Sequence, residues 1–427
     1  MSAPATRLSA LVSILIAAFV LRCGTGIVLQ HLLDHKLNRF CLISGDAEGY
    51  WHLGKELARG ADYKIYDPPR YVERMPGFPL LLAGCIKLFG ENMYAIRIVL
   101  AAVGTLVCGL VYWLGRELFD HQTALVAAAL AAISPALTGF SILILSEMLF
   151  TAGILGSLIS LAKLAKTDFT HAGRLRGLWL AAAAGGWCAF ATYVRPSWLL
   201  FAPGFVLVYF LLAADRKSAL VRGVVLLASL GALLAPWTYR NYVVTGHFVP
   251  TTLWLGASLY DSLNQRANGD SDMAFVEADG IFRSQSEYAA DRFYRDAAWE
   301  FVKSNPRRGL ELAGIKLLRF WKPWPNAEQF NGLLPRAVIA TFFFPAVVLA
   351  LLQLGLWMRA GRRCLRQHAW GIFLALGPLA YFTALHMIFV GSLRYRLPAA
   401  ASALVISAAG AVSVWKFRQA RDAKDEG

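Results

Sequence analysis

The chain has 427 residues, of which 57% are hydrophobic and only 16% are charged, and its mean hydropathy is +0.49. A soluble chain of this length would carry about 25% charged residues and would not repeat apolar runs of about 20 residues, so a soluble globular protein is excluded. The net charge of +15 is not accompanied by any RNA- or DNA-binding motif, and the basic residues fall in short loops between apolar runs, so we expect no nucleic-acid partner.

The apolar runs predict an all-α polytopic membrane protein with about ten transmembrane helices. The first run is too long for the core of a signal peptide and lacks a clear cleavage site, so it predicts a retained helix. A further run over 76–90 is short for a crossing and begins with Pro-Gly-Phe-Pro, which favours an interfacial or re-entrant helix. The predicted spans are 8–30, 92–114, 122–140, 146–164, 175–193, 197–213, 219–237, 335–358, 369–390 and 397–416.

Basic residues mark one side of the predicted bundle. They lie between spans four and five, six and seven, and eight and nine, and after span ten, all of which fall on one side when the number of spans is even. The positive-inside rule makes that side cytoplasmic. We therefore expect a multi-pass protein of the cytoplasmic (inner) membrane with both termini in the cytoplasm. The residues are Lys163, Lys166, Arg174, Arg176, Arg216, Lys217, Arg222, Arg359, Arg362, Arg363, Arg366, Lys416, Arg418, Arg421 and Lys424.

Two long loops, 31–91 and 238–334, are expected on the extracytoplasmic face. The first predicts an amphipathic helix over 47–59, because its apolar residues recur every three or four positions. The second is polar in its middle and too long to lack structure, so it predicts a small subdomain on the membrane face. The expected parts are an N-terminal transmembrane catalytic module (1–237, including loop 31–91), an extracytoplasmic loop subdomain (238–334), and C-terminal transmembrane helices with a cytoplasmic tail (335–427).

Two acidic residues are expected at the extracytoplasmic membrane boundary. Asp46 follows the first span, where it could be a helix N-cap or a catalytic carboxylate. Glu147 begins the fourth span at its outer end, where it could be an acid favoured by the helix dipole or a buried carboxylate with a functional role. Because both fall at one membrane level, they could act as base and orienter, or share a divalent metal.

Five arginines are also expected on the extracytoplasmic side, where the positive-inside bias disfavours them. A single one is commonly a snorkelling contact with lipid head groups, whereas five at one level favour a lipid phosphate, whose oxygens match the guanidinium fork. Aromatic residues gather at the same level. An interfacial belt explains most of them, although sugar rings also stack on aromatic faces. The five arginines are Arg74, Arg195, Arg240, Arg394 and Arg396.

These residues occur in an ordered set of short motifs that runs across nearly the whole chain. The motifs are Asp46-Ala-Glu-Gly-Tyr50, Glu73-Arg74-Met-Pro-Gly-Phe-Pro79, Ser146-Glu147, Val194-Arg195-Pro196, Pro236-Trp-Thr-Tyr-Arg-Asn-Tyr242 and Arg394-Tyr-Arg-Leu-Pro398. The set resembles the C-type (GT-C) integral-membrane glycosyltransferases. Within them it is similar to the polyprenyl- or dolichyl-phosphate-mannose protein mannosyltransferases and the bacterial aminoarabinose transferases of lipid A. Each motif is weak alone, and the set is less specific for substrate than for the superfamily.

The resemblance implies a transferase that moves one sugar, a hexose or pentose, from a polyprenyl-phosphate-linked donor in the membrane lipid to an extracytoplasmic protein, lipid or glycan. It implies Asp46 as the essential acid and Glu147 as the second acidic position. No cofactor is certain; Mg²⁺ or Mn²⁺, if used, would have these two as ligands. The residues expected at the donor phosphate are Glu73, Arg74, Arg195, Arg240, Arg394 and Arg396, and those expected to bind substrate are Tyr50, Tyr239, Asn241 and Tyr395.

We expect an inverting displacement at the anomeric carbon, with Asp46 as general base. A lipid-linked oligosaccharide ligase or polymerase remains an alternative. A lipid flippase or transporter is the third reading, but that class tends to show inverted repeats and midplane charges, and no repeat is apparent here. The chain ends soon after span ten, without the large soluble carboxy-terminal domain of some relatives, so their acceptors are not carried over.

Overall fold

A computed structural model describes residues 4–168, 170–325 and 332–425. Their regular structure is helical, apart from an isolated bridge between Ile65 and Arg70. Eight of the described helices are long and apolar enough to cross a membrane, which confirms the all-α polytopic fold. They are α1 (Pro4–Leu32), α4 (Met93–Leu118), α7 (Glu147–Lys166), α8 (His171–Val194), α10 (Arg216–Thr245), α16 (Leu333–Arg359), α17 (Arg362–Ile388) and α18 (Leu393–Asp425).

Two further predicted spans are shorter than a usual crossing. The run 122–140 is divided into α5 (His121–Ile133) and α6 (Pro135–Phe140). The division falls where Ser134 accepts a hydrogen bond from the Leu137 N–H and a proline follows, because proline cannot continue the backbone hydrogen bonds of the preceding helix. The run 197–213 likewise becomes a 3-10 turn, η2 (Pro196–Trp198), followed by α9 (Phe201–Leu212).

Helix α7 lies in the middle of the bundle, where it packs against α4, α8, α17 and α18. In its most apolar 18-residue stretch 83% of the residues are buried, against 11% in the corresponding stretch of α16. Small residues allow the close packing. A Cβ added to Gly153, for example, would lie 2.9 Å from the Cα of Ala191 in α8. The first turn of α7 is buried as well, including Glu147, Met148 and Phe150.

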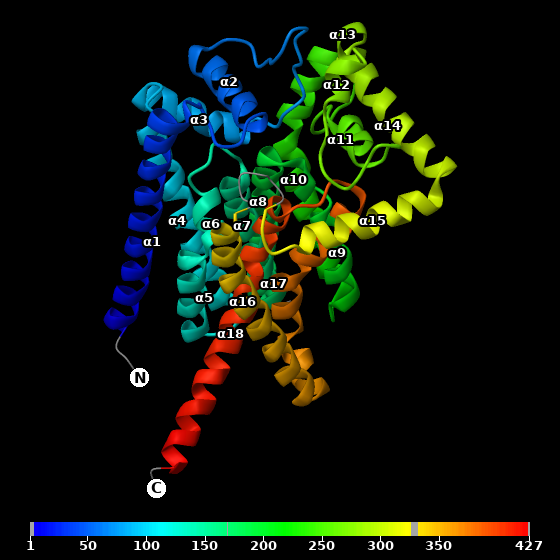
Figure 1. Cartoon of the computed structure of the whole chain (residues 1–427). Helices are drawn as coiled ribbons and strands as arrows, with labels where there is room; N and C mark the ends of the chain where they lie inside the picture. Colours follow the sequence, from blue (N-terminus) through cyan, green and yellow to red (C-terminus); the bar gives the residue numbers. More distant parts are fainter. Residues whose placement is uncertain (1–3, 169, 326–331, 426–427) are drawn as a thin grey trace.

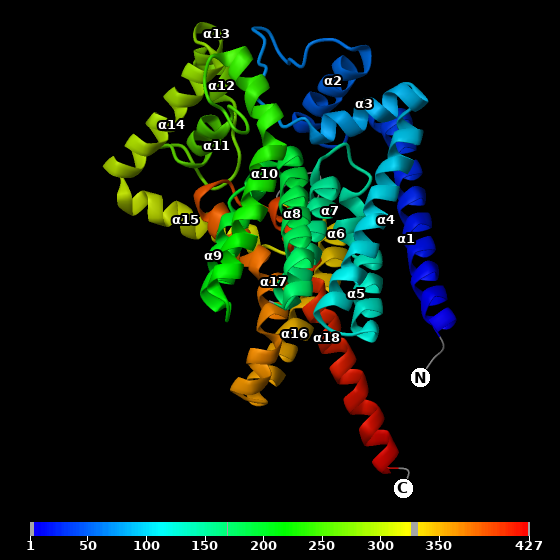
Figure 2. The same ribbon diagram turned by 180° about the vertical axis from the view of Figure 1, so that it is seen from behind.

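One end of the bundle carries the loop structures, as Figures 1 and 2 both show. The loop after α1 and η1 (Leu33–Leu37) forms α2 (Asp46–Arg59) and α3 (Gly77–Phe89), which pack against each other. Helix α2 confirms the helix predicted over 47–59, and α3 corresponds to the short apolar run 76–90. Helix α1 begins and α18 ends at the opposite end of the bundle.

A set of short helices after α10 forms an outer subdomain at the same end of the bundle as α2 and α3 (Figures 1 and 2). It has its own buried cluster, built on Ala257, Phe282, Ala290 and Tyr294. The subdomain returns to the bundle through α15, which packs against α17 and α18. Of the predicted loop 238–334, residues 326–331 lie outside the described residues. Its helices are α11 (Leu255–Ser262), α12 (Phe275–Ala278), α13 (Ile281–Ser284), α14 (Glu287–Ser304) and α15 (Pro306–Trp321).

Candidate active site

Three helices that are distant in the sequence begin close to one another. Asp46 is the first residue of α2, Glu147 is the first residue of α7, and Arg394 lies in the first turn of α18. The Nη1 of Arg394 lies 2.7 Å from Oδ2 of Asp46, and its Nε donates to Oε1 of Glu147. One guanidinium group therefore joins the two carboxylates that the sequence places at the same membrane level.

Two more arginines complete this ion cluster, which we define as Asp46, Arg74, Glu147, Arg195 and Arg394. Arg74 donates from Nη1 to Oδ1 of Asp46 at 2.6 Å, and Arg195 donates from Nη1 to Oε1 of Glu147 at 2.8 Å. Arg74 precedes α3, and Arg195 is the C-cap residue of α8. These two segments meet at Gly77, where an added Cβ would lie 2.7 Å from the Tyr193 carbonyl oxygen, so only glycine allows the approach.

The cluster is largely shielded from solvent. The Glu147 side chain is 0% exposed, the three arginines are 13–17% exposed, and Asp46 is the most accessible at 30%. Charges buried in this way are tolerated when each has a partner of opposite sign. Three guanidinium groups face two carboxylates, so the cluster carries one excess positive charge. Such a site favours an additional anion.

The Asp46 carboxyl group is ionised. Its burial favours the neutral form, but the charges of Arg74 and Arg394 outweigh that effect and hold the pKa of Asp46 well below its usual range. The same carboxylate holds the pKa of Arg74 above its usual range, against the effect of burial. Asp46 was open to interpretation as an N-cap; instead Gly45 is the N-cap, and the two Asp46 oxygens bind guanidinium groups.

Several polar atoms of the cluster are buried without a hydrogen-bond partner: Nε of Arg74, Nη2 of Arg394 and Oε2 of Glu147. Buried donors without partners are rare in folded proteins because each forfeits its hydration. Two N–H groups, one on each of these arginines, are therefore left without an acceptor, and an anion that reached them would be stabilised.

Glu73 and Arg70 extend the cluster toward the outer subdomain. The buried Glu73 carboxylate pairs with Nη1 of Arg70 at 3.0 Å and lies 3.6 Å from Nη2 of Arg74. Burial raises the pKa of Glu73, although Arg74 and Arg70 both oppose the shift. The Arg70 guanidinium lies 3.9 Å from the centre of the Phe282 ring, so the extension is anchored in the subdomain.

Two of the expected substrate-binding tyrosines border the cluster. The Arg74 guanidinium lies over the Tyr50 ring at 5.0 Å, and the Tyr50 hydroxyl lies 3.3 Å from the Ser146 hydroxyl. Tyr395 lies under both Arg195 and Arg394, at 5.3 and 5.8 Å. Both rings therefore pack against the guanidinium groups that would hold an anion.

The other expected residues are engaged elsewhere. Arg240 donates to the carbonyls of Tyr71 and Tyr63, which ties loop one to α10. Arg396 donates to the Phe320 carbonyl at 2.8 Å and so ties α18 to α15. The Asn241 amide donates to the Val249 and Thr251 carbonyls, and Tyr239 is 71% exposed. The structure thus brings together Asp46, Tyr50, Glu73, Arg74, Glu147, Arg195, Arg394 and Tyr395, and not these four.

The donor set does not fit a divalent metal. Asp46 and Glu147 share the Arg394 guanidinium between them, so a cation there would have to displace a positive group. Both Asp46 oxygens and one Glu147 oxygen already accept from arginine. Among the described residues no group of three histidine, cysteine, aspartate or glutamate side chains has the arrangement of a metal site.

Glu287 is a residue at the edge of the site that the sequence does not single out. It begins α14, and its carboxylate accepts hydrogen bonds from the backbone N–H groups of Tyr71 and Val72, at 2.9 and 3.0 Å. These two residues immediately precede Glu73 and Arg74, so Glu287 fastens the outer subdomain to the loop that carries Arg74. Burial raises the pKa of Glu287 to about 7, although the two backbone hydrogen bonds oppose the shift.

This pKa predicts a pH-dependent contribution to stability. Because the folded-state pKa of about 7 exceeds the ordinary value of 4.5, the folded protein binds the Glu287 proton more tightly than the unfolded chain. The contribution is complete below pH 4.5 and is lost as the pH rises through 7. We expect the thermal unfolding midpoint of the wild type to fall more than that of Glu287→Gln as the pH is raised. Equal pH dependence in the two proteins would contradict the assignment.

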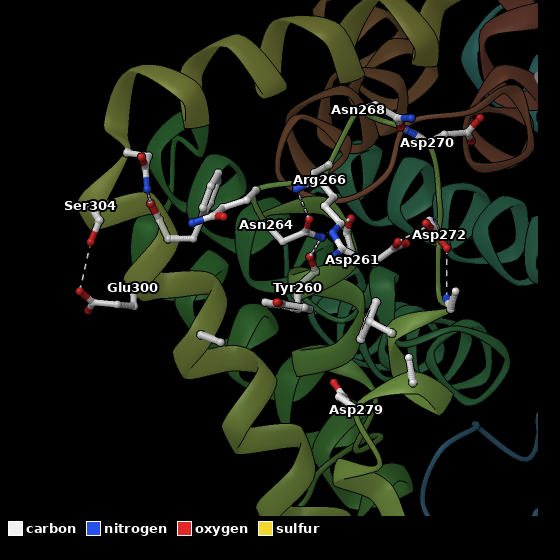
Figure 3. A pocket seen from close by; sticks show the side chains of 18 residues that line it. Tyr260, Asp261, Asn264, Arg266, Asn268, Asp270, Asp272, Asp279, Glu300 and Ser304 are labelled. Carbon is white, nitrogen blue, oxygen red and sulfur yellow. Dashed lines mark hydrogen bonds between the residues drawn. The ribbon is translucent and has the colours of Figure 1, made fainter.

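The outer subdomain also contains a cavity of about 870 Å³ between α11, α14 and the loop that joins α11 to α12 (Figure 3). Two of the carboxylates that line this cavity stabilise the local structure through hydrogen bonds. Asp261 accepts from the Ser271 hydroxyl and the Asp272 N–H, and Asp279 accepts from the Tyr294 hydroxyl. None of the residues that line it belongs to the ion cluster.

Comparisons with known proteins agree with this architecture. A family model described as dolichyl-phosphate-mannose-protein mannosyltransferase matches residues 70–239, which is less than half of the chain. That range contains Glu73, Arg74, Glu147 and Arg195, and excludes Asp46 and Arg394. Among curated proteins no sequence match is found.

The solved structures that match include the archaeal oligosaccharyltransferase AglB from Archaeoglobus fulgidus. In complex with an inhibitory peptide and a dolichol-phosphate it gives a TM-score of 0.59 at 17% identity over 98% of this chain, and its apo form gives 0.57 at the same identity and coverage. The chain spans about half of that protein, 52% of its length. ArnT from Cupriavidus metallidurans bound to undecaprenyl phosphate gives 0.44 at 18% identity, over 96% of this chain and 78% of its own. The chain therefore resembles the archaeal oligosaccharyltransferase in fold, and residues 70–239 match the mannosyltransferase family model.

Proposed function

We propose that this protein is a membrane glycosyltransferase that moves a single sugar from a polyprenyl-phosphate-linked donor to an acceptor on the extracytoplasmic face of the inner membrane. The observation that carries the proposal is the ion cluster: a partly accessible aspartate is paired with two of the three arginines, and the cluster has an excess positive charge and unused N–H donors. Such a site suits a lipid phosphate next to a carboxylate base. The match to a mannosyltransferase family model over residues 70–239 supports the same class of reaction.

In the proposed reaction the acceptor hydroxyl attacks the anomeric carbon on the face opposite the phosphate. Asp46 accepts the hydroxyl proton, the new bond forms between the acceptor oxygen and the anomeric carbon, and the bond from that carbon to the phosphate oxygen breaks. The phosphate keeps the electron pair, and the configuration is inverted. Arg74 and Arg394 stabilise the charge that grows on the leaving phosphate, which is worth most where water is excluded.

Glu147 is proposed to position the arginines. It is fully buried and accepts from both Arg195 and Arg394, so it fixes their guanidinium groups at the first turn of α7. Asp46 is also paired with two arginines, but its side chain is 30% exposed whereas that of Glu147 is 0% exposed, so an acceptor hydroxyl can reach Asp46 and not Glu147. We therefore propose that Asp46 is the general base and that Glu147 is an orienting group.

The proposed orientation rests on the distribution of basic residues. Those between α7 and α8, between α9 and α10, and between α16 and α17 lie at the end of the bundle away from α2 and α3 (Figure 1). The positive-inside rule assigns that end to the cytoplasm. The donor would then lie in the outer leaflet, and the acceptor would approach from the side of the outer subdomain.

A second candidate is an oligosaccharide transferase that moves a whole glycan. The fold supports this second candidate, because the matching structures with the higher TM-scores are those of an oligosaccharyltransferase. The two candidates differ in the size of the transferred group. A purified, reconstituted preparation should release polyprenyl phosphate from a single-sugar donor. Release only from a lipid-linked oligosaccharide would contradict the first proposal and support the second.

The sugar and the acceptor can be found by mass spectrometry of envelope lipids and glycans. Cells that make the wild-type protein are compared with cells that make Asp46→Asn. The proposal predicts one or more species that differ by the mass of a single sugar residue. A difference of a complete oligosaccharide, or none, would contradict it.

Gly49→Ala tests the placement of Arg74 without changing a charge. An added Cβ would lie 2.9 Å from Nε and 3.3 Å from Cζ of Arg74, so the flexible guanidinium must move away from α2. We expect transfer to fall by about tenfold or more, because small misplacements of binding groups are costly, while the unfolding midpoint changes little. Gly84→Ala in α3 is the control, because nothing lies within 4 Å of its added Cβ. Equal activity of the two variants would contradict the assignment.

A further inference from the structure

Asp46 occupies the same donors that a phosphate would use. Its Oδ1 accepts from Arg74 at 2.6 Å and its Oδ2 pairs with Arg394 at 2.7 Å, so one carboxylate spans two guanidinium groups. A phosphate presents the same type of acceptor oxygen and prefers the same donors. Besides Nη1, the two arginines hold Nε of Arg74 and Nη2 of Arg394 buried without hydrogen-bond partners. A phosphate bound there would compete with Asp46 for the Nη1 groups of Arg74 and Arg394. It could also accept hydrogen bonds from the two N–H groups that have no partner.

Each carboxylate of the cluster is paired with two arginines, but the two differ in their exposure to solvent. Glu147 is 0% exposed and is fixed by Arg195 as well as Arg394. Asp46 is 30% exposed, and it lies at the start of α2, a helix of loop one outside the membrane-spanning helices. An anion that enters the cluster therefore meets Asp46 first and can displace it without uncovering the buried Glu147. Of the two, Asp46 is the exchangeable ligand of Arg394.

We infer that Asp46 occupies the donor-phosphate site in the resting protein, and that the phosphate of the donor displaces it from Arg74 and Arg394 and so frees it to act as the base. This rests on the proposed function. Arg394 stays paired with Glu147 throughout, so the exchange changes one contact of each arginine and leaves the α7 end of the cluster in place. Donor binding and activation of the base are then one event.

The exchange explains how a carboxylate whose pKa is held low in the resting protein can act as a base. In the resting arrangement the charges of the two arginines overcome the effect of burial and hold the pKa of Asp46 well below its usual range, so it has little affinity for a proton. When a phosphate neutralises those charges, the carboxylate loses the contacts that suppress it, and its pKa rises. A protein without donor would then hold no active base.

The inference makes a prediction that a simple supporting role for Asp46 does not make. If Asp46 competes with the phosphate, its replacement by a neutral residue should tighten binding of polyprenyl phosphate while abolishing transfer. If Asp46 instead supports the phosphate site, its replacement should weaken binding or leave it unchanged. Removal of a like charge within a few ångström of the phosphate should tighten binding by about tenfold or more.

The experiment measures binding of a polyprenyl phosphate to the purified full-length protein in detergent, with the uncharged polyprenol as the reference ligand. The proteins are the wild type, Asp46→Asn and Asp46→Ser, each compared after size-exclusion chromatography has shown a folded monodisperse sample. Serine serves as a second neutral residue, so the result does not depend on how the asparagine amide packs.

Glu48→Gln is the charge-matched control. Glu48 lies on the same helix, is exposed, and bonds only the Gly45 N–H among the contacts of its side chain in the described structure. The Glu48→Gln substitution removes one negative charge close to Asp46 without changing a contact of an arginine. We therefore expect the affinity of this variant for polyprenyl phosphate to stay within about twofold of the wild type. Equal tightening in Glu48→Gln and Asp46→Asn would show a general charge effect and would overturn the inference.

The outcomes separate the inference from the proposed function. Tighter binding in both Asp46 variants but not in Glu48→Gln supports the exchange. Unchanged or weaker binding in the Asp46 variants overturns the exchange while leaving the lipid-phosphate site intact. If the wild type prefers polyprenyl phosphate no more than polyprenol, the proposed function itself fails, and the inference fails with it.

Discussion

Asp46→Asn should abolish sugar transfer while the protein remains folded. Asparagine is nearly isosteric and can still accept from one guanidinium group, but it cannot accept the acceptor proton. The loss of a general base costs on the order of 10²–10⁴-fold in rate. Release of polyprenyl phosphate from a single-sugar donor measures the effect, with equal amounts of folded variant and wild type confirmed by size-exclusion chromatography.

The control for this experiment is Glu48→Gln, two positions along the same helix. Its side chain is exposed and contacts no residue of the ion cluster, so transfer should stay within about twofold of the wild type. If Asp46→Asn kept more than a tenth of wild-type activity, Asp46 would not be the base. The cluster would then act only in binding.

Arg394→Gln should produce the second large effect, and it should act on activity and stability together. Arg394 is the group that joins Asp46 to Glu147, so its loss removes a phosphate ligand and leaves the buried Glu147 with Arg195 as its remaining arginine. We expect transfer to fall by about 10²–10³-fold, as for removal of a charge-stabilising donor. The free energy of unfolding should fall by about 3 kcal/mol, because a buried ion pair is broken.

The variants Arg394→Lys and Arg396→Gln separate the effect on activity from the effect on stability. Lysine keeps the charge but cannot bridge two carboxylates with one planar fork, so part of the stability should return and most of the activity should not. Arg396 lies on the same helix, two positions further on, and donates to the Phe320 carbonyl. Its replacement should lower the unfolding midpoint and reduce activity per folded molecule less than Arg394→Gln does. The reverse order would identify Arg396 as the phosphate ligand.

The architecture, and the position of the site relative to the membrane-spanning helices, could be predicted from the sequence because they depend on local patterns. Runs of apolar residues define the long helices, and the spacing of Tyr50 and Leu53 defines the face of α2 that is buried. Glu147 could be placed at the start of a buried helix because a polar residue directly precedes an apolar run. The break at Pro135 carried a signal as well, although the surrounding apolar run obscured it.

The sequence could not separate the expected residues that join the cluster from those that do not, because this depends on which segments meet in space. Arg74, Arg240 and Arg396 occur in equally suggestive motifs at one membrane level, yet only Arg74 reaches Asp46. The difference comes from long-range packing, such as the approach of Gly77 to the Tyr193 carbonyl. Glu287 gives no sequence signal, because its partners are backbone N–H groups more than 200 residues away.

The most direct test of the account is a structure of the full chain with a polyprenyl phosphate bound. We predict that the phosphate lies within hydrogen-bond distance of Arg74 and Arg394, with Glu147 still paired to Arg195. A phosphate held at the opposite end of the bundle, for example by Arg362, Arg363 and Arg366, with Asp46 still bonded to both of its arginines, would contradict the assignment of this cluster as the lipid-phosphate site.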